Sequence, residues 1–554
     1  MIRDWLRNVR KYLIYTTAGL LAVAGSSRAQ APDDVNARLA AQERQIQELK
    51  AMIQANGIHP AAAADAKLDD ASVKKIVDGY MAEKEGQRKA ADAEAALKLE
   101  TEGFKVGSDL SLKARWDYFG GFVAETPNKD FTFHIGARFQ EDTVAWTQSP
   151  GSKSAAQLGD FQDGTFFRRI RINMNGTMWQ TFEYNTEFAL EQVKEGIPTL
   201  DEVWAGTKDI PFLGTIRAGH MHIFPGLEGD GYSSSKAMTF MEKSYITDAL
   251  FQNENQAPAV LVTNSVLDQH MTWATMFYRQ EFEKHNNDGV DLGDGKYAYG
   301  ARVTMLPIWQ NEGTHFLHLG ASASWRKAEN ADPGLVGPGG VTLFARPLMR
   351  DAIGDYGGVT NGGAILPGDT KHLVDTGLLN ASSTAILAGE LFYVCGPFSI
   401  QSESAYTQVS DASIAGVPVV GANASSTRSF WGTYVQASYF LTGEHRTYDR
   451  RMGRLDPNYF TGPNTNFWFT RDADGHMMMG RGAWEIAARY NYLNLNDGPI
   501  HGGVVNGTEV ALNWYLNPAV KIQFEYETSN RWDLKAGQLP STVQSFGTRL
   551  QLSF

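Results

Sequence analysis

The feature that most constrains this chain is a two-residue alternation of apolar and polar side chains. It recurs in segments of about ten residues from residue 130 to residue 554. In residues 181–192, one face carries Phe182, Tyr184, Thr186, Phe188 and Leu190, and the other carries Glu183, Asn185, Glu187 and Glu191. Because successive side chains of a β-strand point to opposite faces, this pattern predicts strands with one apolar and one polar face. We therefore expect an all-β fold.

Two architectures produce strands of this kind. In a soluble β-sandwich the apolar face is core and the charged face meets solvent. In an outer-membrane β-barrel the apolar face meets lipid and the polar face lines the lumen. Here the polar face is charged almost throughout, and aromatic side chains lie toward the segment ends, where bilayer interfaces place aromatic girdles. The pattern favours the barrel, with apolar residues outside.

The last segment, residues 546–554, indicates how the sheet closes. One face carries Thr548, Leu550, Leu552 and Phe554, and the other carries Gly547, Arg549, Gln551 and Ser553. Outer-membrane barrels commonly end on an aromatic residue in mid-strand, because the final strand pairs with the first and leaves no open edge in lipid. We expect this segment to pair with the one near residue 131.

The number of segments predicts the size of the barrel. Sixteen begin near residues 131, 165, 181, 200, 213, 257, 269, 295, 314, 384, 398, 428, 482, 507, 519 and 543. A 16-stranded antiparallel transmembrane β-barrel over residues 130–554 encloses a water-filled lumen. Residues 371–379 are either a further strand or a loop. Residues 327–383 and 443–480 are rich in Gly, Pro and Asp, and we expect them to be extracellular loops.

Composition excludes other classes of protein. A formal charge of −12 disfavours a nucleic-acid-binding protein, which neutralises phosphates with Lys and Arg. The single cysteine, Cys395, excludes an intrachain disulfide and a metal site built from clustered thiols. Ser, His and Asp are present, but no nucleophile elbow or other spaced catalytic motif brings them together. We expect no enzymatic activity and no cofactor.

The first residues indicate export. Residues 1–29 have a basic start, an apolar stretch over 12–24 and the cleavage pattern Ser27-Arg28-Ala29, which predicts a signal peptide. The alternative, a membrane anchor, is disfavoured because roughly 13 apolar residues are too few to span a bilayer. Removal of this segment takes away five basic residues and one acidic residue, which leaves a charge of −16.

A short helical region is expected next, in the periplasm. Residues 33–56 carry a heptad seam at Val35, Leu39, Gln42, Ile46, Leu49 and Ile53. This spacing predicts a coiled coil, and so short a seam needs another copy of itself to be stable. The alternative is a single amphipathic helix on the barrel. Residues 57–129 are rich in Ala, Lys and Glu and predict a solvated helical spacer and lead-in, with strand-like alternation from Gly107.

Arginines fall on the face that would line the lumen. Alternation places Arg169 and Arg171 there, and the same holds at Arg217, Arg302, Arg489 and Arg549. Guanidinium groups lining a pore attract anions and bind oxyanions with two hydrogen bonds. The alternative is that these arginines pair with acidic residues of the same lumen, such as Glu183, Glu187, Glu485 and Glu525.

The second candidate region is residues 220–245, which are too irregular to form a strand. They contain three consecutive hydroxyl residues and a cation, at Ser233, Ser234, Ser235 and Lys236. Folded into the lumen, such a loop would form a constriction with donors for an oxyanion; otherwise it is an ordinary surface loop. His220 and His222 have a spacing that could chelate a metal, but nothing nearby completes the site, so we expect no metal.

The chain resembles the phosphate-selective porin O/P family of Gram-negative outer membranes. The resemblance covers most of residues 130–554 in order. The stretches that carry it are Phe167-Arg-Arg-Ile-Arg-Ile172, Glu183-Tyr-Asn-Thr-Glu-Phe188, Val203 to Phe224, Ser234-Ser-Lys-Ala-Met-Thr-Phe-Met-Glu242, Tyr439-Phe-Leu-Thr-Gly-Glu444, Gly482-Ala-Trp-Glu-Ile-Ala-Ala-Arg-Tyr490 and Asn513-Trp-Tyr-Leu-Asn517.

The resemblance implies a homotrimer of barrels in which an in-folded loop faces an arginine-lined wall. The matching positions are Arg168, Arg169, Ser234 and Ser235, with Lys236 beside them and Asp201 at an acidic position. One departure from the family pattern argues against tight phosphate selectivity. A lysine expected just before the paired serines is missing near Gly231, and Asp230 is present instead.

We therefore expect an outer-membrane porin that allows passive diffusion of small anions such as phosphate. Its partners would be small anions, outer-membrane lipid and two further copies of itself. Two alternatives remain: a general, weakly selective porin, and a structural anchor that contacts the cell wall through the coiled coil. The position of the loop at 220–245 would decide the pore radius.

Overall fold

The computed structural model describes residues 106–117, 121–154, 157–194, 197–223, 225–229, 235–251, 256–279, 284–286, 289–291, 297–328, 340–350, 371–456, 467–472 and 474–554. The predicted signal peptide, the predicted coiled coil and the predicted spacer up to residue 105 lie outside this part of the chain. Among the described residues, no helix is both long enough and apolar enough to cross a membrane.

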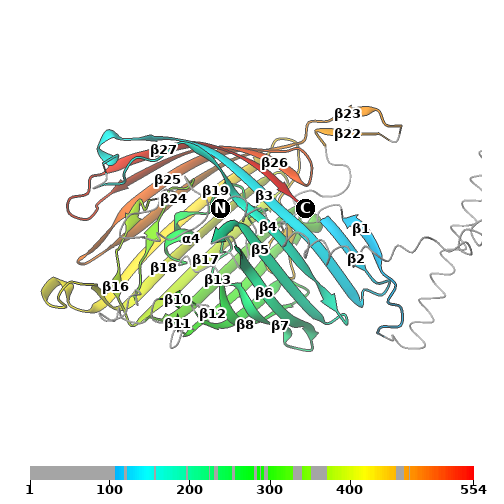
Figure 1. Cartoon of the computed structure of the whole chain (residues 1–554), viewed down its shortest axis with the longest axis horizontal. Coiled ribbons are helices and arrows are strands. Elements are labelled where there is room, and N and C mark those ends of the chain that lie inside the picture. The colour runs from blue at the N-terminus through cyan, green and yellow to red at the C-terminus, as the bar shows by residue number, and fades with distance from the viewer. Residues whose placement is uncertain are drawn as a thin grey trace, which may run out of the picture. The chain divides into compact units, whose positions relative to one another are not determined.

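The main sheet is a closed barrel of sixteen antiparallel strands (Figure 1). The strands are β3 (Phe131–Gln148), β4 (Gly164–Met178), β5 (Phe182–Lys194), β6 (Ile197–Ile210), β7 (Gly214–His222), β8 (Gln256–Val266), β9 (Met271–Arg279), β12 (Tyr297–Gln310), β13 (His315–Lys327), β17 (Ser383–Cys395), β18 (Phe398–Ile414), β19 (Ser426–Phe440), β24 (Ala483–Asp497), β25 (Ile500–Tyr515), β26 (Val520–Trp532) and β27 (Ser541–Ser553). The predicted 16-stranded barrel is confirmed. The largest difference in position is the fourteenth strand, which was expected near residue 507 and begins at Ile500.

The barrel closes between its last and first strands, as the alternation of residues 546–554 predicts. β27 pairs with β3 from Val543 opposite Gln148 to Ser553 opposite Arg138. Phe554 continues the ladder by exchanging two backbone hydrogen bonds with Ala137, at 2.8 and 3.0 Å. No edge of this sheet is left open between the two strands, which is the condition for a sheet in hydrocarbon.

A hairpin extends the sheet where β27 ends. It consists of β1 (Lys113–Asp117) and β2 (Gly121–Glu125), and β2 pairs with β3 over residues 132–135. Gly121 has a φ of +81°, and a Cβ there would lie 2.5 Å from the Ile135 carbonyl oxygen, so only glycine fits this close approach. The strand-like alternation that begins at Gly107 therefore corresponds to β-structure before β3.

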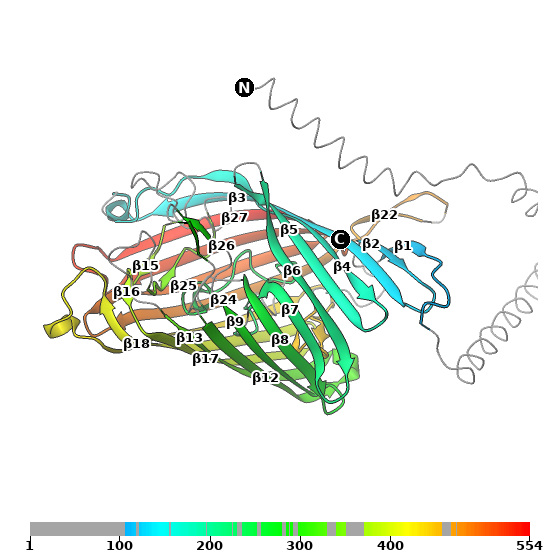
Figure 2. The ribbon, with the colours of Figure 1, turned by 60° about the horizontal axis from the view of Figure 1, so that its bottom comes forward.

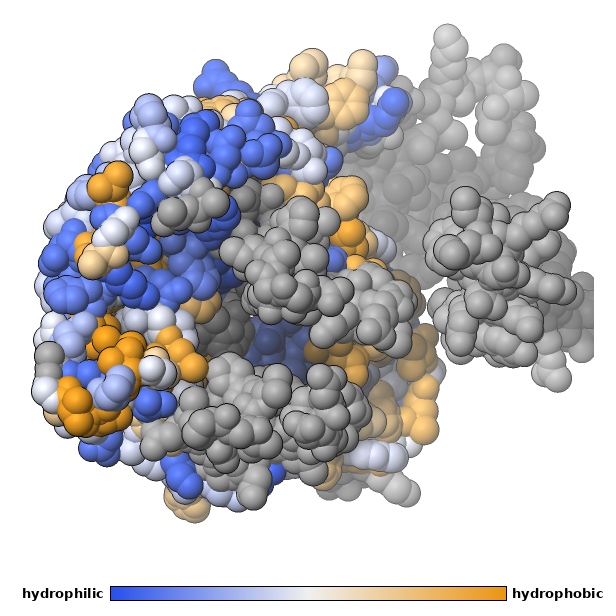
Figure 3. All heavy atoms as spheres, turned by 60° about the vertical axis from the view of Figure 1, so that its left-hand side comes forward, coloured by the Kyte–Doolittle hydropathy of each residue, from blue (hydrophilic) through white to orange (hydrophobic). Residues whose placement is uncertain are grey.

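The two faces of the barrel wall differ as the alternation predicts. On β27, Phe546 is 51% exposed, whereas Arg549 is 1% exposed. Outward positions carry apolar residues and inward positions carry polar and charged ones along the strands, which is the arrangement of a lipid-facing barrel. The end of the barrel with the longer loops presents many hydrophilic residues (Figure 3).

The two ends of the barrel carry different connections. The end that holds Phe554 has short connections between strands, at residues 179–181, 211–213, 267–270, 311–314, 396–397 and 516–519. Short turns face the periplasm in barrels of this kind. Because strands alternate in direction, the connection between β19 and β24, residues 441–482, also lies at this end. The expectation that 443–480 is an extracellular loop is therefore wrong: composition indicates the length of a loop, but the number of preceding strands decides its side.

The connection between β13 and β17 lies at the opposite end and contains short bridges. β14 (Phe344–Ala345) pairs with β15 (Val374–Asp375), and β16 (Leu379–Asn380) pairs with β18. Residues 371–379 are thus part of a loop and not a further barrel strand. The remaining elements are α4 (Tyr245–Ala249), β10 (Lys284–Asn286), β11 (Gly289–Asp291), β20 (Tyr448–Asp449), β21 (Arg454–Leu455), β22 (Phe469–Arg471), β23 (Met477–Met479) and the 3-10 turns Pro150–Ser152, Asn311–Gly313 and Gly421–Asn423.

Residues 235–251, which follow β7 and include α4, lie inside the barrel against β24–β27 (Figures 1 and 2). The Met241 backbone N–H donates to Glu525 Oε2 at 2.7 Å, and the Tyr245 hydroxyl lies 2.6 Å from Ser529 Oγ. Gly507 allows this approach, since a Cβ there would meet the Tyr245 hydroxyl at 2.6 Å. The main apolar cluster is therefore inside the barrel, where residues of this loop and of 341–348 contact the wall: Tyr245, Ile246, Leu250, Leu343, Leu348, Phe430, Leu493 and Val505.

Because the outward face meets lipid, a charged side chain placed there should destabilise the barrel more at the middle of the membrane than near its edge. Val510 is 48% exposed and lies near mid-strand, so we expect Val510→Arg to lower the free energy of unfolding by about 2–4 kcal/mol in lipid vesicles. Leu552→Arg, close to the end of β27, should cost about 0–1 kcal/mol. Urea titration of the folded barrel measures both values, and equal costs would contradict an apolar band centred on Val510.

Candidate functional site

A bulge in β4 turns two neighbouring arginines into the lumen. In the pairing of β3 with β4, Gln140 lies opposite Arg169 and Glu141 lies opposite Phe167, so Arg168 is the extra residue on its strand. A bulge of this kind interrupts the alternation of side chains. Arg168 and Arg169 are consequently both buried inside the barrel.

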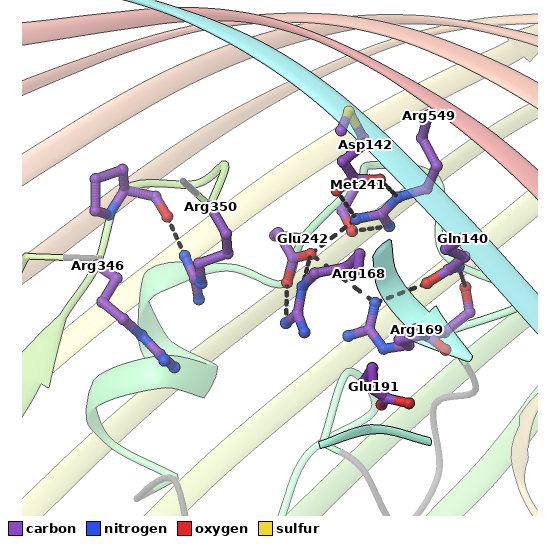
Figure 4. A network of polar contacts seen from close by, with 12 residues as sticks. Gln140, Asp142, Arg168, Arg169, Glu191, Met241, Glu242, Arg346, Arg350 and Arg549 are labelled. Carbon is purple, nitrogen blue, oxygen red and sulfur yellow. Dashed lines mark hydrogen bonds and ion pairs between the residues drawn. The ribbon is translucent and has the colours of Figure 1, made fainter. Parts of the chain in front are cut away.

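Arg168 and Arg169 meet a carboxylate of the in-folded loop (Figure 4). Arg168 binds Glu242 with two hydrogen bonds, from Nε at 2.7 Å and from Nη2 at 3.0 Å. Arg549, on β27, donates to the same carboxylate at 2.9 Å and also binds Asp142 on β3 at 2.6 and 2.7 Å. Although burial opposes ionisation, the three guanidinium groups hold the pKa of Glu242 well below its usual value. Glu242 therefore carries a negative charge at the centre of the group.

Arg171 and Arg217 are paired with acidic residues of the wall. Arg171 lies 3.0 Å from both Glu187 and Glu191 and 2.5 Å from Asp201. Arg217 donates to Glu183 at 2.6 Å. The alternative left open by the sequence, in which lumen arginines pair with acids, holds at these two positions. It also holds at Arg302 with Glu390, at Arg489 with Glu509 and Glu228, and at Arg549 with Asp142.

Asp201 is held by several donors at once. Besides Arg171, it accepts a hydrogen bond from Gln256 Nε2 at 2.8 Å and lies 3.4 Å from His222 Nε2. Asp201, on β6, is therefore one of the acids that neutralise Arg171.

Ser235 and Lys236 form a second group with Arg138 of β3. Arg138 Nη1 donates to Ser235 Oγ, and the guanidinium lies 3.4 Å from Glu187. Gln140, which accepts from Arg169 at 2.9 Å, donates to the Ser235 carbonyl at 3.4 Å and so joins the two groups. Burial, with the charge of Arg138, lowers the pKa of Lys236 to about 8.

Sequence reasoning missed Arg138, although a signal for it was present. The alternation of residues 131–142 places Thr132, His134, Arg138 and Gln140 on one face, and the same rule that selected Arg169 would have selected Arg138. Of the predicted loop residues, Ser235 and Lys236 reach the wall, whereas Ser233 and Ser234 lie outside the described residues.

A second segment enters the barrel from the short-turn end. Arg446, which precedes β20, pairs with Glu485 at 2.5 Å and donates to the Ala237 carbonyl at 2.9 Å and to Thr239 Oγ1 at 2.8 Å. The Tyr448 hydroxyl lies 2.7 Å from His318 Nδ1 on β13. The two in-folded segments therefore touch inside the lumen.

The loop covers one side of the lumen more completely than the other. Lumen-facing residues of β24–β26, such as Glu485, Arg489 and Glu525, are at most 2% exposed. Among the lumen-facing residues of β4 and β5, Asn175 and Glu183 are half-buried, whereas Glu187 and Glu191 are 8% exposed.

The described residues contain one group of three Asp and His side chains that could ligate a metal ion, and it lies outside the lumen. Asp472, Asp474 and His476 are at the turn of the β22–β23 hairpin, and their ligand atoms all lie within 4.8 Å of one another. His220 and His222 do not form such a group in this part of the chain.

Comparison with known proteins agrees with this architecture. Residues 152–554 match the family model for phosphate-selective porin O and P. The chain belongs to the phosphate-selective porin O and P family. It is 23% identical to Porin O of Pseudomonas aeruginosa over 467 residues, which cover 81% of this chain and 93% of that protein. An uncharacterized protein of Caulobacter vibrioides is 25% identical over 434 residues, covering 77% and 74%.

Among solved structures, an anion-selective porin from Comamonas acidovorans is similar with a TM-score of 0.42 and 9% identity, covering 76% of this chain and 100% of that one. Family and fold together are those of a channel in the outer membrane of a Gram-negative bacterium.

The lowered pKa of Lys236 predicts a pH dependence. Its ammonium group is charged below about pH 8 and neutral above it. We expect the preference of the pore for anions over cations to fall between pH 7 and pH 9, measured as the reversal potential across a planar bilayer. Lys236→Arg keeps its charge throughout this range, so this variant should lose the pH dependence. An unchanged fall in Lys236→Arg would contradict the assignment.

Proposed function

We propose that this porin allows passive diffusion of small anions such as phosphate or other oxyanions. The observation that carries the proposal is the group of Arg138, Ser235 and Lys236, where the in-folded loop meets β3. Two cations and a hydroxyl lie together there, and Arg138 donates to Ser235 Oγ. Guanidinium, ammonium and hydroxyl groups are the donors that oxyanions need.

The charges around this group support local and not uniform anion preference. Arg138 lies 3.4 Å from Glu187, at the long end of an ion pair, whereas Arg171 has three carboxylates within 3.0 Å. Arg138 is consequently paired less closely with carboxylates than Arg171 is, and salt limits the reach of its charge to about 8–10 Å.

A weakly selective porin is the second candidate. Arg171 and Arg217 are offset by Glu183, Glu187, Glu191 and Asp201, so much of the lumen wall carries both signs of charge. A wall of this kind would admit small polar solutes of either sign. The homotrimer and a cell-wall contact through residues 33–56 remain predictions, and the second falls on residues outside the described part.

The reversal potential in planar bilayers under a KCl gradient tests the proposal. We expect anion preference in the native protein and block of the chloride current by millimolar phosphate. Arg138→Gln should shift the reversal potential toward cations and weaken the block, because it removes the guanidinium beside Ser235.

Lys153→Gln is the matched control, since it removes one positive charge from an exposed loop ion pair with Asp160 outside the lumen. Its reversal potential should equal that of the native protein. Cation preference, or no block by millimolar phosphate, would reject oxyanion selectivity and leave the weakly selective porin.

A further inference from the structure

Three polar side chains of the wall beneath the in-folded loop carry buried oxygen atoms without a donor. They are Glu525 and Glu527 on β26 and Ser545 on β27. Neither carboxylate oxygen of Glu527 has a hydrogen-bond partner in the described part of the chain, and the same holds for Glu525 Oε1 and Ser545 Oγ. All three residues are at most 2% exposed. Buried polar atoms are nearly always satisfied, so these oxygen atoms indicate a missing partner.

The register of the sheet gathers these oxygen atoms at one place on the wall. Ser545 lies directly opposite Glu527 on β27, and Glu509 lies opposite it on β25. Directly opposite residues of an antiparallel pair have their side chains about 5 Å apart. Glu525 lies two residues before Glu527 and points to the same face of β26. Two carboxylates and a hydroxyl are therefore neighbours on the lumen side.

The in-folded segments cover this place. The Met241 backbone N–H donates to the other oxygen of Glu525, Oε2, at 2.7 Å. Gly547 lies opposite Glu525, and a Cβ there would meet Met349 Sδ at 2.6 Å and Met241 Sδ at 3.1 Å. The oxygen atoms consequently lie between the barrel wall and the two segments 235–251 and 340–350.

The arginine of this part of the wall does not balance the two carboxylates. Arg489 donates to both oxygen atoms of Glu509, at 2.5 and 2.7 Å, and also to Glu228 at 3.0 Å. Its single charge is thus already shared by two acids. A buried carboxylate that no cation faces is costly, so Glu525 and Glu527 need positive charge from elsewhere.

We propose that Glu525, Glu527 and Ser545 bind a calcium ion that holds the in-folded loop against the wall. Oxygen ligands favour a hard cation, and two carboxylates match the charge of Ca²⁺. Ca²⁺ accepts six to eight oxygen ligands in flexible geometry, whereas Mg²⁺ demands a near-ideal octahedron. Water completes the ligands that the three side chains supply. The inference goes beyond the proposed function, since it concerns how the loop is held and not which solute passes.

Thermal unfolding of the refolded barrel tests the site. We expect the native protein to unfold at a higher temperature in millimolar Ca²⁺ than in a chelator. The shift should saturate with the Ca²⁺ concentration, because an ion that binds only the folded state stabilises it. Mg²⁺ at the same concentration should give a smaller shift.

Glu527→Gln removes one carboxylate and keeps the side-chain volume. In the chelator it should unfold at the same temperature as the native protein or a higher one, because it buries one charge fewer. The shift with Ca²⁺ should be lost. If this variant does not fold, Ser545→Ala replaces it: the Ca²⁺ concentration for half of the shift should rise about two- to tenfold, as expected for loss of one neutral oxygen contact.

Two matched controls remove a carboxylate elsewhere. Glu183→Gln removes the lumen carboxylate that accepts from Arg217. Asp472→Asn removes one from the exposed group at the turn of the β22–β23 hairpin, which could bind the ion independently. Both variants should keep the native shift with Ca²⁺.

The outcomes decide the inference without any measurement of current. No saturable effect of Ca²⁺ on the native protein, or an equal shift in Glu527→Gln, would overturn the site. Stabilisation of the native protein by acid in the chelator, with no effect of Ca²⁺, would show that the two carboxylates hold protons instead and would also overturn it. The anion preference of the pore can hold or fail in each case.

Discussion

The structure depends on one constraint: in hydrocarbon, every backbone N–H and C=O group must find a partner within the protein. The pairing of β27 with β3 and the bonds between Phe554 and Ala137 meet this constraint by removing the open edge. Closure also decides where side chains go. With apolar residues outside, the polar half of every strand must lie in the lumen, which therefore collects many charges.

Those charges determine how the lumen is filled. A buried guanidinium is costly unless a carboxylate faces it, and the acids come from two sources. Arg171 and Arg217 find theirs on neighbouring strands, whereas Arg168 binds Glu242 of the in-folded loop. Arg489 binds both Glu509 of the neighbouring strand and Glu228, which lies between β7 and that loop. The loop is held by ion pairs as well as by apolar contacts, so the elements that occupy the lumen also decide which arginines of the wall are neutralised.

Period-2 alternation along the sequence predicted some features of the fold and not others. Period-2 alternation located all sixteen strands and the closing pair, because it repeats in every strand. It did not reveal the bulge that turns Arg168 inward, since a bulge is an exception to the period. Composition, and not alternation, assigned residues 443–480 to the wrong end of the barrel, because the Gly, Pro and Asp content of a loop carries no information about its side of the membrane. Arg138 was within reach of the same rule and was overlooked.

The sequence by itself determined the all-β barrel, the number of its strands and which face of each strand is apolar, because these follow from the spacing of apolar residues along the chain. Only the tertiary structure decided which arginines are neutralised. Arg168 and Glu242 are 74 positions apart, and Arg549 and Asp142 are 407 apart. Such pairs form only when the sheet has closed and the loop has folded inward, so no local pattern predicts them. The candidate site was therefore predicted as a set of residue types, and its arrangement came from closure.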